Sequence, residues 1–76
     1  MMEKREILIK FSDRIRILRK QKGFSQEELS FRADLHRTYI GMIERAEKNI
    51  TLVNIERIAV ALEISLGDLF KIENGK

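Results

Sequence analysis

The sequence contains no cysteine, no proline and no tryptophan, and it has a single histidine. Without cysteine the chain forms neither a disulfide nor a thiolate metal site, and one histidine cannot complete a metal cage. We therefore expect no metal and no cofactor, and we assign His36 to helix capping. The absence of cysteine also fits a reducing compartment, so a cytoplasmic location is expected.

Long apolar runs are also missing. The first eleven residues carry charges within their apolar stretch and offer no small-residue cleavage site, so neither a signal peptide nor a membrane anchor is expected. Seventy-six residues suffice for one small domain, covering 1–76. No acid, base and nucleophile are clustered along the chain, so an enzyme and a small-molecule ligand are not expected.

The charge is unevenly distributed. Residues 1–22 carry eight Lys or Arg against three acids, while residues 23–76 carry seven against nine. A basic segment of this kind is either a solvated helix face or, beside a DNA-reading helix, a contributor to phosphate binding through counterion release. Both interpretations stay open at this point.

Apolar spacing predicts an all-α fold of five helices with no strand. The first covers about 6–22, with Leu8, Phe11, Ile15 and Leu18 on one face, and Gly23 ends it. Two short helices follow at about 26–33 and 37–45. A fourth runs from Leu52 to Leu62, turning Leu52, Ile55, Ile58, Ala59 and Leu62 to the core, and a short fifth contains Leu66, Leu69 and Phe70.

Capping residues set the predicted helix starts. Ser25 and Glu28 form an S-x-x-E capping box, in which each side chain satisfies a backbone N–H of the other. His36, Thr51 and Ser65 occupy the later N-cap positions. Between the second and third helices, Asp34 is expected to take a positive φ.

The two helices at about 26–45 have distinct faces. Leu29, Ala33, Leu35, Ile40 and Ile43 are predicted to face the scaffold. The opposite side of the second helix of the pair would then carry Arg37, Thr38, Gly41, Met42 and Arg45.

The strings S-Q-E-E-L at 25–29, H-R-T-Y-I-G at 36–41 and I-E-R at 43–45 resemble the Cro and phage-repressor type of helix-turn-helix protein. The continuation N-I-T-L-V-N-I-E-R-I-A-V-A-L-E-I-S at 49–65 extends the resemblance, which covers about residues 11–70. The small size and the H-R-T-Y-I-G string most resemble the controller proteins of restriction-modification systems. Ser30, Asp34, Ala46 and Lys48 depart from the family pattern: Ala46 replaces a common glycine, and Lys48 replaces a frequent arginine.

This resemblance implies double-stranded operator DNA as the partner. The helix at 37–45 would enter the major groove, where Arg37 can pair with guanine O6 and N7 and Thr38 can offer its hydroxyl or methyl. Gly41 would either permit close approach to the duplex or be a neutral choice, and Met42 would either contact thymine methyls or fill a gap. The full set of expected base contacts is Arg37, Thr38, Gly41, Met42, Arg45 and Lys48.

Phosphate contacts are expected around this helix. The resemblance implies a contact at Gln26, and the further candidates are Ser25, Tyr39 and Asn49. For Ser25 and Asn49 the alternatives are a helix cap and a turn former. The resemblance also implies that Arg19 pairs with Glu44 and fixes the recognition helix to the scaffold.

Controllers of this type bind palindromic operators as dimers, so a homodimer is expected. Its predicted interface lies in 52–71 and beside it, at Ile50, Ile64, Leu66, Phe70 and Ile72. For Leu66 and Phe70 the alternative is packing in the core. RNA polymerase is a further partner that the resemblance implies. The alternatives are a phage-type or antitoxin-type repressor of the same fold and, in a different class, a helical module that binds protein.

Overall fold

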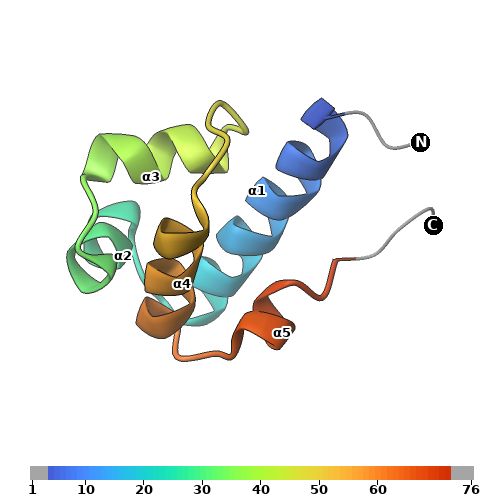
Figure 1. Cartoon of the computed structure of the whole chain (residues 1–76). Coiled ribbons are helices and arrows are strands. Elements are labelled where there is room, and N and C mark those ends of the chain that lie inside the picture. Colours follow the sequence, from blue (N-terminus) through green and yellow to red (C-terminus); the bar gives the residue numbers. More distant parts are fainter. Residues whose placement is uncertain (1–3, 73–76) are drawn as a thin grey trace.

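The computed structural model describes residues 4–72, and in this range the chain forms helices, turns and loops with no strand. Figure 1 shows α2 and α3 together on one side of the molecule and α1 and α5 on the other. The predicted all-α, five-helix fold is confirmed. The helices are α1 (Lys4–Gln21), α2 (Gln26–Ala33), α3 (Arg37–Glu44), α4 (Leu52–Ala61) and α5 (Leu66–Leu69).

Four of the five helices begin at a predicted N-cap. The side chains of Ser25, Thr51 and Ser65 each accept a hydrogen bond from the backbone N–H three residues later, at 3.0 to 3.2 Å. His36 Nδ1 accepts from the Thr38 N–H at 3.0 Å, which confirms its capping role. A side-chain acceptor at this position satisfies a donor that the helix itself cannot use.

The capping box at Ser25 is only half formed. Ser25 Oγ accepts from the Glu28 N–H, but the Glu28 carboxylate accepts from Arg32 Nε at 2.6 Å, one helical turn further on. The expected reciprocal bond to Ser25 is therefore wrong. An ion pair with a charged partner on the same helix face is the stronger interaction for that carboxylate.

Three helices are followed, within two residues, by a non-glycine residue in the left-handed conformation. Asp34 has a φ of 55°, as predicted, while Ala46 and Glu63 each have a φ of 61°. For an L-residue with a Cβ this conformation costs roughly 1–2 kcal/mol. Ala46 thus keeps the backbone geometry that a glycine would normally supply, and the chain after α3 turns back sharply.

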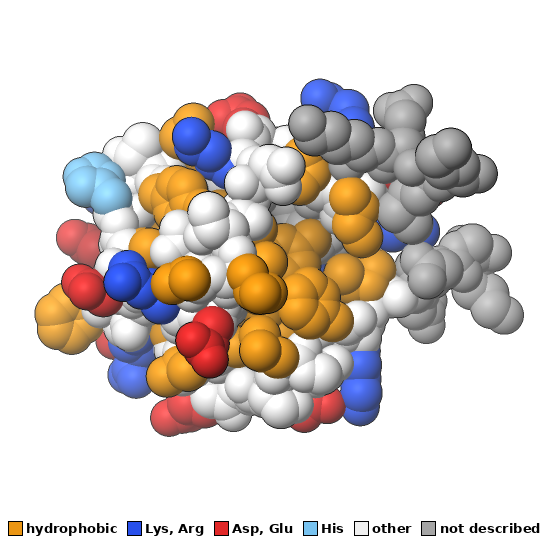
Figure 2. All heavy atoms as spheres, viewed as in Figure 1, with side chains coloured by type: hydrophobic (Ala, Val, Ile, Leu, Met, Phe, Trp, Pro, Cys, Tyr) orange, Lys and Arg blue, Asp and Glu red, His pale blue; other side chains and the backbone are white. Residues whose placement is uncertain are grey.

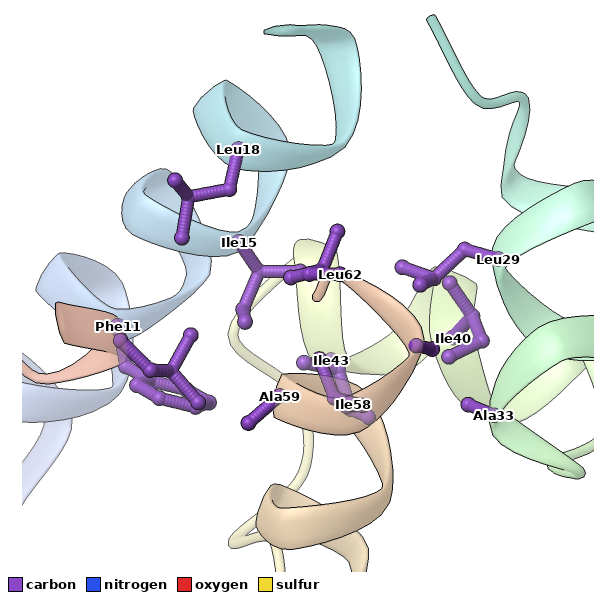
Figure 3. Packing of buried hydrophobic residues seen from close by; sticks show 12 residues of the cluster. Phe11, Ile15, Leu18, Leu29, Ala33, Ile40, Ile43, Ile58, Ala59 and Leu62 are labelled. Carbon is purple, nitrogen blue, oxygen red and sulfur yellow. The ribbon is translucent and has the colours of Figure 1, made fainter. Parts of the chain in front are cut away.

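One apolar core joins the helices, as Figure 3 shows. Phe11, Ile15 and Leu18 of α1 are buried in it, as their spacing predicts, whereas Leu8 is only partly buried. Leu29, Ala33, Ile40 and Ile43 fix α2 and α3 to this core. From the C-terminal half it contains Ile58, Ala59, Ala61, Leu62 and Leu69.

The prediction that Leu52 is a core residue is wrong, because its side chain is 71% exposed. Leu52 is the first residue of α4 and precedes the buried Ile58 by six positions. At 3.6 residues per turn, six positions place it roughly 120° round the helix from Ile58. Ala61 is buried instead.

Candidate nucleic-acid interface

The outer face of α3 carries two exposed polar side chains, Arg37 and Thr38. Ile40 and Ile43 on the opposite face are almost completely buried and hold the helix against the core. Arg37 and Thr38 border an open hollow together with Gln26, His36, Gly41 and Arg45. The structure thus brings four of the predicted base contacts and one predicted phosphate contact to a single surface.

A buried ion pair sets the position of this face. Glu44, at the end of α3, is 3% exposed, and its carboxylate accepts from Arg19 Nε at 2.7 Å and from Arg19 Nη2 at 3.1 Å. Gln26 Nε2 donates to the same carboxylate at 3.0 Å. One side chain of α3 is therefore bound to both α1 and α2, and the expected pairing of Arg19 with Glu44 is confirmed.

Arg45 lies just after α3, since the helix ends at Glu44 and not at Arg45 as predicted. Its Nε and Nη2 donate to the two carboxylate oxygens of Glu47 at 3.0 and 3.2 Å. This bidentate pair raises the pKa of Arg45 and lowers that of Glu47, mainly through the side-chain hydrogen bonds between them. The role of Glu47 was missed in the sequence, because residues two apart do not face each other on a helix.

Gly41 is buried, so its expected place on an exposed surface is wrong. A Cβ built at this position would lie 3.1 Å from Arg45 Nη1 and 3.8 Å from Gln26 Oε1. The side chain of Arg45 therefore lies across Gly41, and the missing Cβ makes room for that guanidinium. Met42, about 100° further round the helix, is partly buried at the edge of the face.

The remaining predicted DNA contacts are not among the residues that line the hollow. Tyr39 is partly buried, and its hydroxyl accepts from Asn54 Nδ2 of α4 at 3.1 Å, which leaves the phenol hydrogen free to be donated. Lys48 and Asn49 are exposed in the loop after α3. Ser25 is exposed and its hydroxyl caps α2.

Apolar side chains gather over α4, α5 and the adjoining part of α1 in Figure 2. Of the predicted interface residues, Leu66 is 37% and Phe70 is 45% exposed. Ile50, Ile64 and Ile72 are partly buried and pack against the core. Phe70 also contacts Phe11 with a ring-centroid distance of 5.8 Å, so its side chain has a structural role.

Over residues 4–72, no helix has the length and apolar character needed to cross a bilayer. Within the same residues, no three His, Cys, Asp or Glu side chains are grouped closely enough to hold a metal ion.

Two short helices joined by a tight turn, with an exposed polar face on the second and a buried ion pair behind it, define a helix-turn-helix protein. Comparison with known proteins agrees: a family model described as helix-turn-helix matches residues 15–69. The chain belongs to this helix-turn-helix family, and within it to the control proteins of restriction-modification systems.

Three similar proteins support the assignment to the control proteins. Control protein C.MunI of a Mycoplasma species is 42% identical over 66 residues, which are 86% of this chain and 89% of that protein. The restriction-modification controller C.AhdI of Aeromonas hydrophila is 48% identical, with a TM-score of 0.82 over 84% of this chain and 97% of its own. The controller C.Esp1396I, solved as a tetramer with its natural 35-base-pair operator, is 40% identical, with a TM-score of 0.81 over 86% of each chain.

Proposed function

We propose that the protein is a sequence-specific transcriptional regulator, the controller of a restriction-modification system, which binds a palindromic operator as a homodimer. The observation that supports it best is the outer face of α3. There Arg37 and Thr38 are exposed, while Glu44 on the inner side is hydrogen-bonded to α1 and α2. A rigidly held helix with free donors is what reading of the major groove needs.

Arg37 is the main base reader in this proposal. Its guanidinium can donate two parallel hydrogen bonds to guanine O6 and N7, and the neighbouring Thr38 offers a hydroxyl and a methyl group. Arg45 and Lys48 extend the reading surface beyond the end of the helix, and Met42 borders it. Gly41 supports the site indirectly, through the space that it leaves for Arg45.

Phosphate contacts would hold the helix in register. The N-terminus of α2 presents backbone N–H groups near Ser25 and Gln26, where an anion is stabilised. Tyr39 can donate its phenol hydrogen, and Asn49 can donate from the loop. Such contacts fix orientation without reading sequence, so the loss of each contact should weaken binding equally for all DNA sequences.

The dimer proposal uses the apolar surface of α5 and its neighbours. A twofold pair would bury the exposed parts of Leu66 and Phe70, together with Ile50, Ile64 and Ile72, and would present two copies of α3 to half-sites about one helical turn apart. Replacing Leu66 by Lys should give monomers in sedimentation velocity without loss of helix content. The matched control is Phe31→Lys on α2, where an 82% exposed apolar side chain is lost outside the proposed interface. Unchanged dimerisation of the Leu66 variant would contradict this interface.

The proposed mechanism is occupancy without catalysis, in the cytoplasm. A bound dimer near a promoter would recruit RNA polymerase, and a second dimer on an adjacent site would block it. Such a circuit delays the endonuclease until the methyltransferase has protected the host DNA. Support for the circuit comes from membership of the control-protein group and not from the geometry of the site.

The direct test is selection of bound duplexes from a random pool by the purified protein. A palindromic consensus is the expected result, and no enrichment even at low salt would overturn the proposal. Arg37→Ala should then lose about 1–3 kcal/mol of discrimination at one base pair of each half-site. Arg37→Lys is the matched control, because it keeps the charge but not the bidentate fork. Uniform weakening across sequences would instead make Arg37 a phosphate contact.

A further inference from the structure

The guanidinium of Arg45 is hydrogen-bonded to a carboxylate of its own chain. The positive φ of Ala46 turns the backbone so that Glu47, two residues later, faces the guanidinium. Both carboxylate oxygens of Glu47 accept from Arg45, at 3.0 and 3.2 Å, while the side chain of Arg45 lies over Gly41. Arg45 also lines the hollow that Arg37 and Thr38 border.

The donors used in this pair can also bind DNA. Nε and Nη2 of Arg45 form one edge of its guanidinium, and a carboxylate, a phosphate or a guanine edge accepts from such a fork with the same geometry. Glu47 also brings a negative charge to a face that would otherwise present the two cations Arg37 and Arg45. Binding of DNA through this edge of Arg45 therefore requires that Glu47 release it.

We propose that Glu47 is an intramolecular competitor for Arg45, which lowers the affinity of the protein for DNA by holding this guanidinium until a duplex displaces the carboxylate. The proposal rests on the DNA-binding function proposed above. It gives Glu47 a role in setting operator occupancy although Glu47 contacts no DNA in this scheme. The pair is solvent-exposed, with side-chain exposures of 58% and 50%, so it is weak enough for a phosphate or a base to displace.

The test is Glu47→Gln, with affinity measured by fluorescence anisotropy on the duplex that the wild-type protein selects. Because exposed ion pairs are weak, the expected gain is modest, up to about fivefold tighter binding. Melting curves followed by circular dichroism establish that the variant is folded.

Glu63→Gln is the matched control. Glu63 is an exposed carboxylate that also accepts from a cation at 3.0 Å, but its partner is Lys22, just after α1. Its pKa is lowered by that partner, as the pKa of Glu47 is by Arg45. Removing this charge should leave the DNA affinity unchanged.

A double-mutant cycle separates competition from general repulsion. In an Arg45→Gln background, Glu47→Gln should no longer tighten DNA binding, because the ion pair between positions 45 and 47 is already lost. An equal gain in both backgrounds would mean that Glu47 merely repels phosphates, and would overturn the proposal. Weaker binding by Glu47→Gln would also overturn it, since Glu47 would then preorganise Arg45. Failure of the wild-type protein to bind any duplex would instead refute the DNA-binding function itself.

Discussion

Removing Arg19 should destabilise the protein far more than removing an exposed arginine. Arg19 and Glu44 form an ion pair in which the two side chains are 12% and 2% exposed. Without Arg19, the Glu44 carboxylate remains buried with only Gln26 as a side-chain donor among the described residues. Loss of one partner of a buried pair typically costs about 3–5 kcal/mol.

That cost is large for a domain of this size. At roughly 0.05–0.15 kcal/mol per residue, the free energy of unfolding should be about 4–11 kcal/mol. Arg19→Gln should therefore remove about a third of the stability or more, and its urea midpoint should fall accordingly. Circular dichroism at about 222 nm reports the helix content of an all-α fold. A urea titration followed at this wavelength therefore measures the change in the free energy of unfolding.

Arg32→Gln supplies the control. Arg32 and Glu28 pair at 2.6 Å, close to the 2.7 Å of Arg19 and Glu44, but both side chains are more than 40% exposed. Arg32 also lies 4.3 Å over the Phe24 ring, so the loss of both contacts should cost about 1 kcal/mol or less. Replacing Arg19 and Glu44 together by Met should recover most of the stability, because no buried charge is then left unpaired. Equal costs for Arg19→Gln and Arg32→Gln would refute the reasoning.

Three further predictions concern single positions. Ala46→Gly should raise the free energy of unfolding by about 1 kcal/mol in urea titrations, because glycine adopts the positive φ without strain; a loss would show that the turn is not strained. Gly41→Ala should also raise the free energy of unfolding, by up to about 1 kcal/mol, because alanine is the better helix former and the exposed guanidinium of Arg45, 3.1 Å from the added Cβ, can move aside. A loss of stability would show that this guanidinium cannot move. The pKa of Asp68 is lowered, first by its hydrogen bond to Lys71, so its contribution to stability is complete at neutral pH and is lost as the pH falls through the folded-state pKa. In Asp68→Asn the urea midpoint should therefore fall less steeply as the pH is lowered. An unchanged pH dependence would contradict this assignment.

Features set by neighbouring residues were predictable from the sequence. The caps Ser25, His36, Thr51 and Ser65 each bond a backbone N–H only two or three residues away, so spacing alone identifies them. The apolar faces of α1, α2 and α3 follow from helical periodicity for the same reason. The turn at Asp34 was also predicted, because few residues tolerate its φ.

Features set by competition between partners were not predictable. Glu28 was expected to complete a capping box, but Arg32 provides a charged partner one turn away. Gly41 was assigned to the surface by its position on the helix, whereas the side chain of Arg45 covers it. Glu47 approaches Arg45 only because the backbone reverses at Ala46. Each outcome depends on a rotamer or backbone angle that spacing alone does not fix.

The separation of the two faces of α3 has a consequence for how this protein can diverge. Arg37 and Thr38 are exposed, while the contacts that hold the helix are made by Glu44, Ile40 and Ile43 on the other side. Substitutions at exposed positions away from such contacts usually change stability by about 0.5 kcal/mol or less. Variants at positions 37 and 38 can thus accumulate almost without a folding penalty. Under the base-reading role proposed for Arg37 and Thr38, substitutions there would change the preferred target sequence while leaving the scaffold intact.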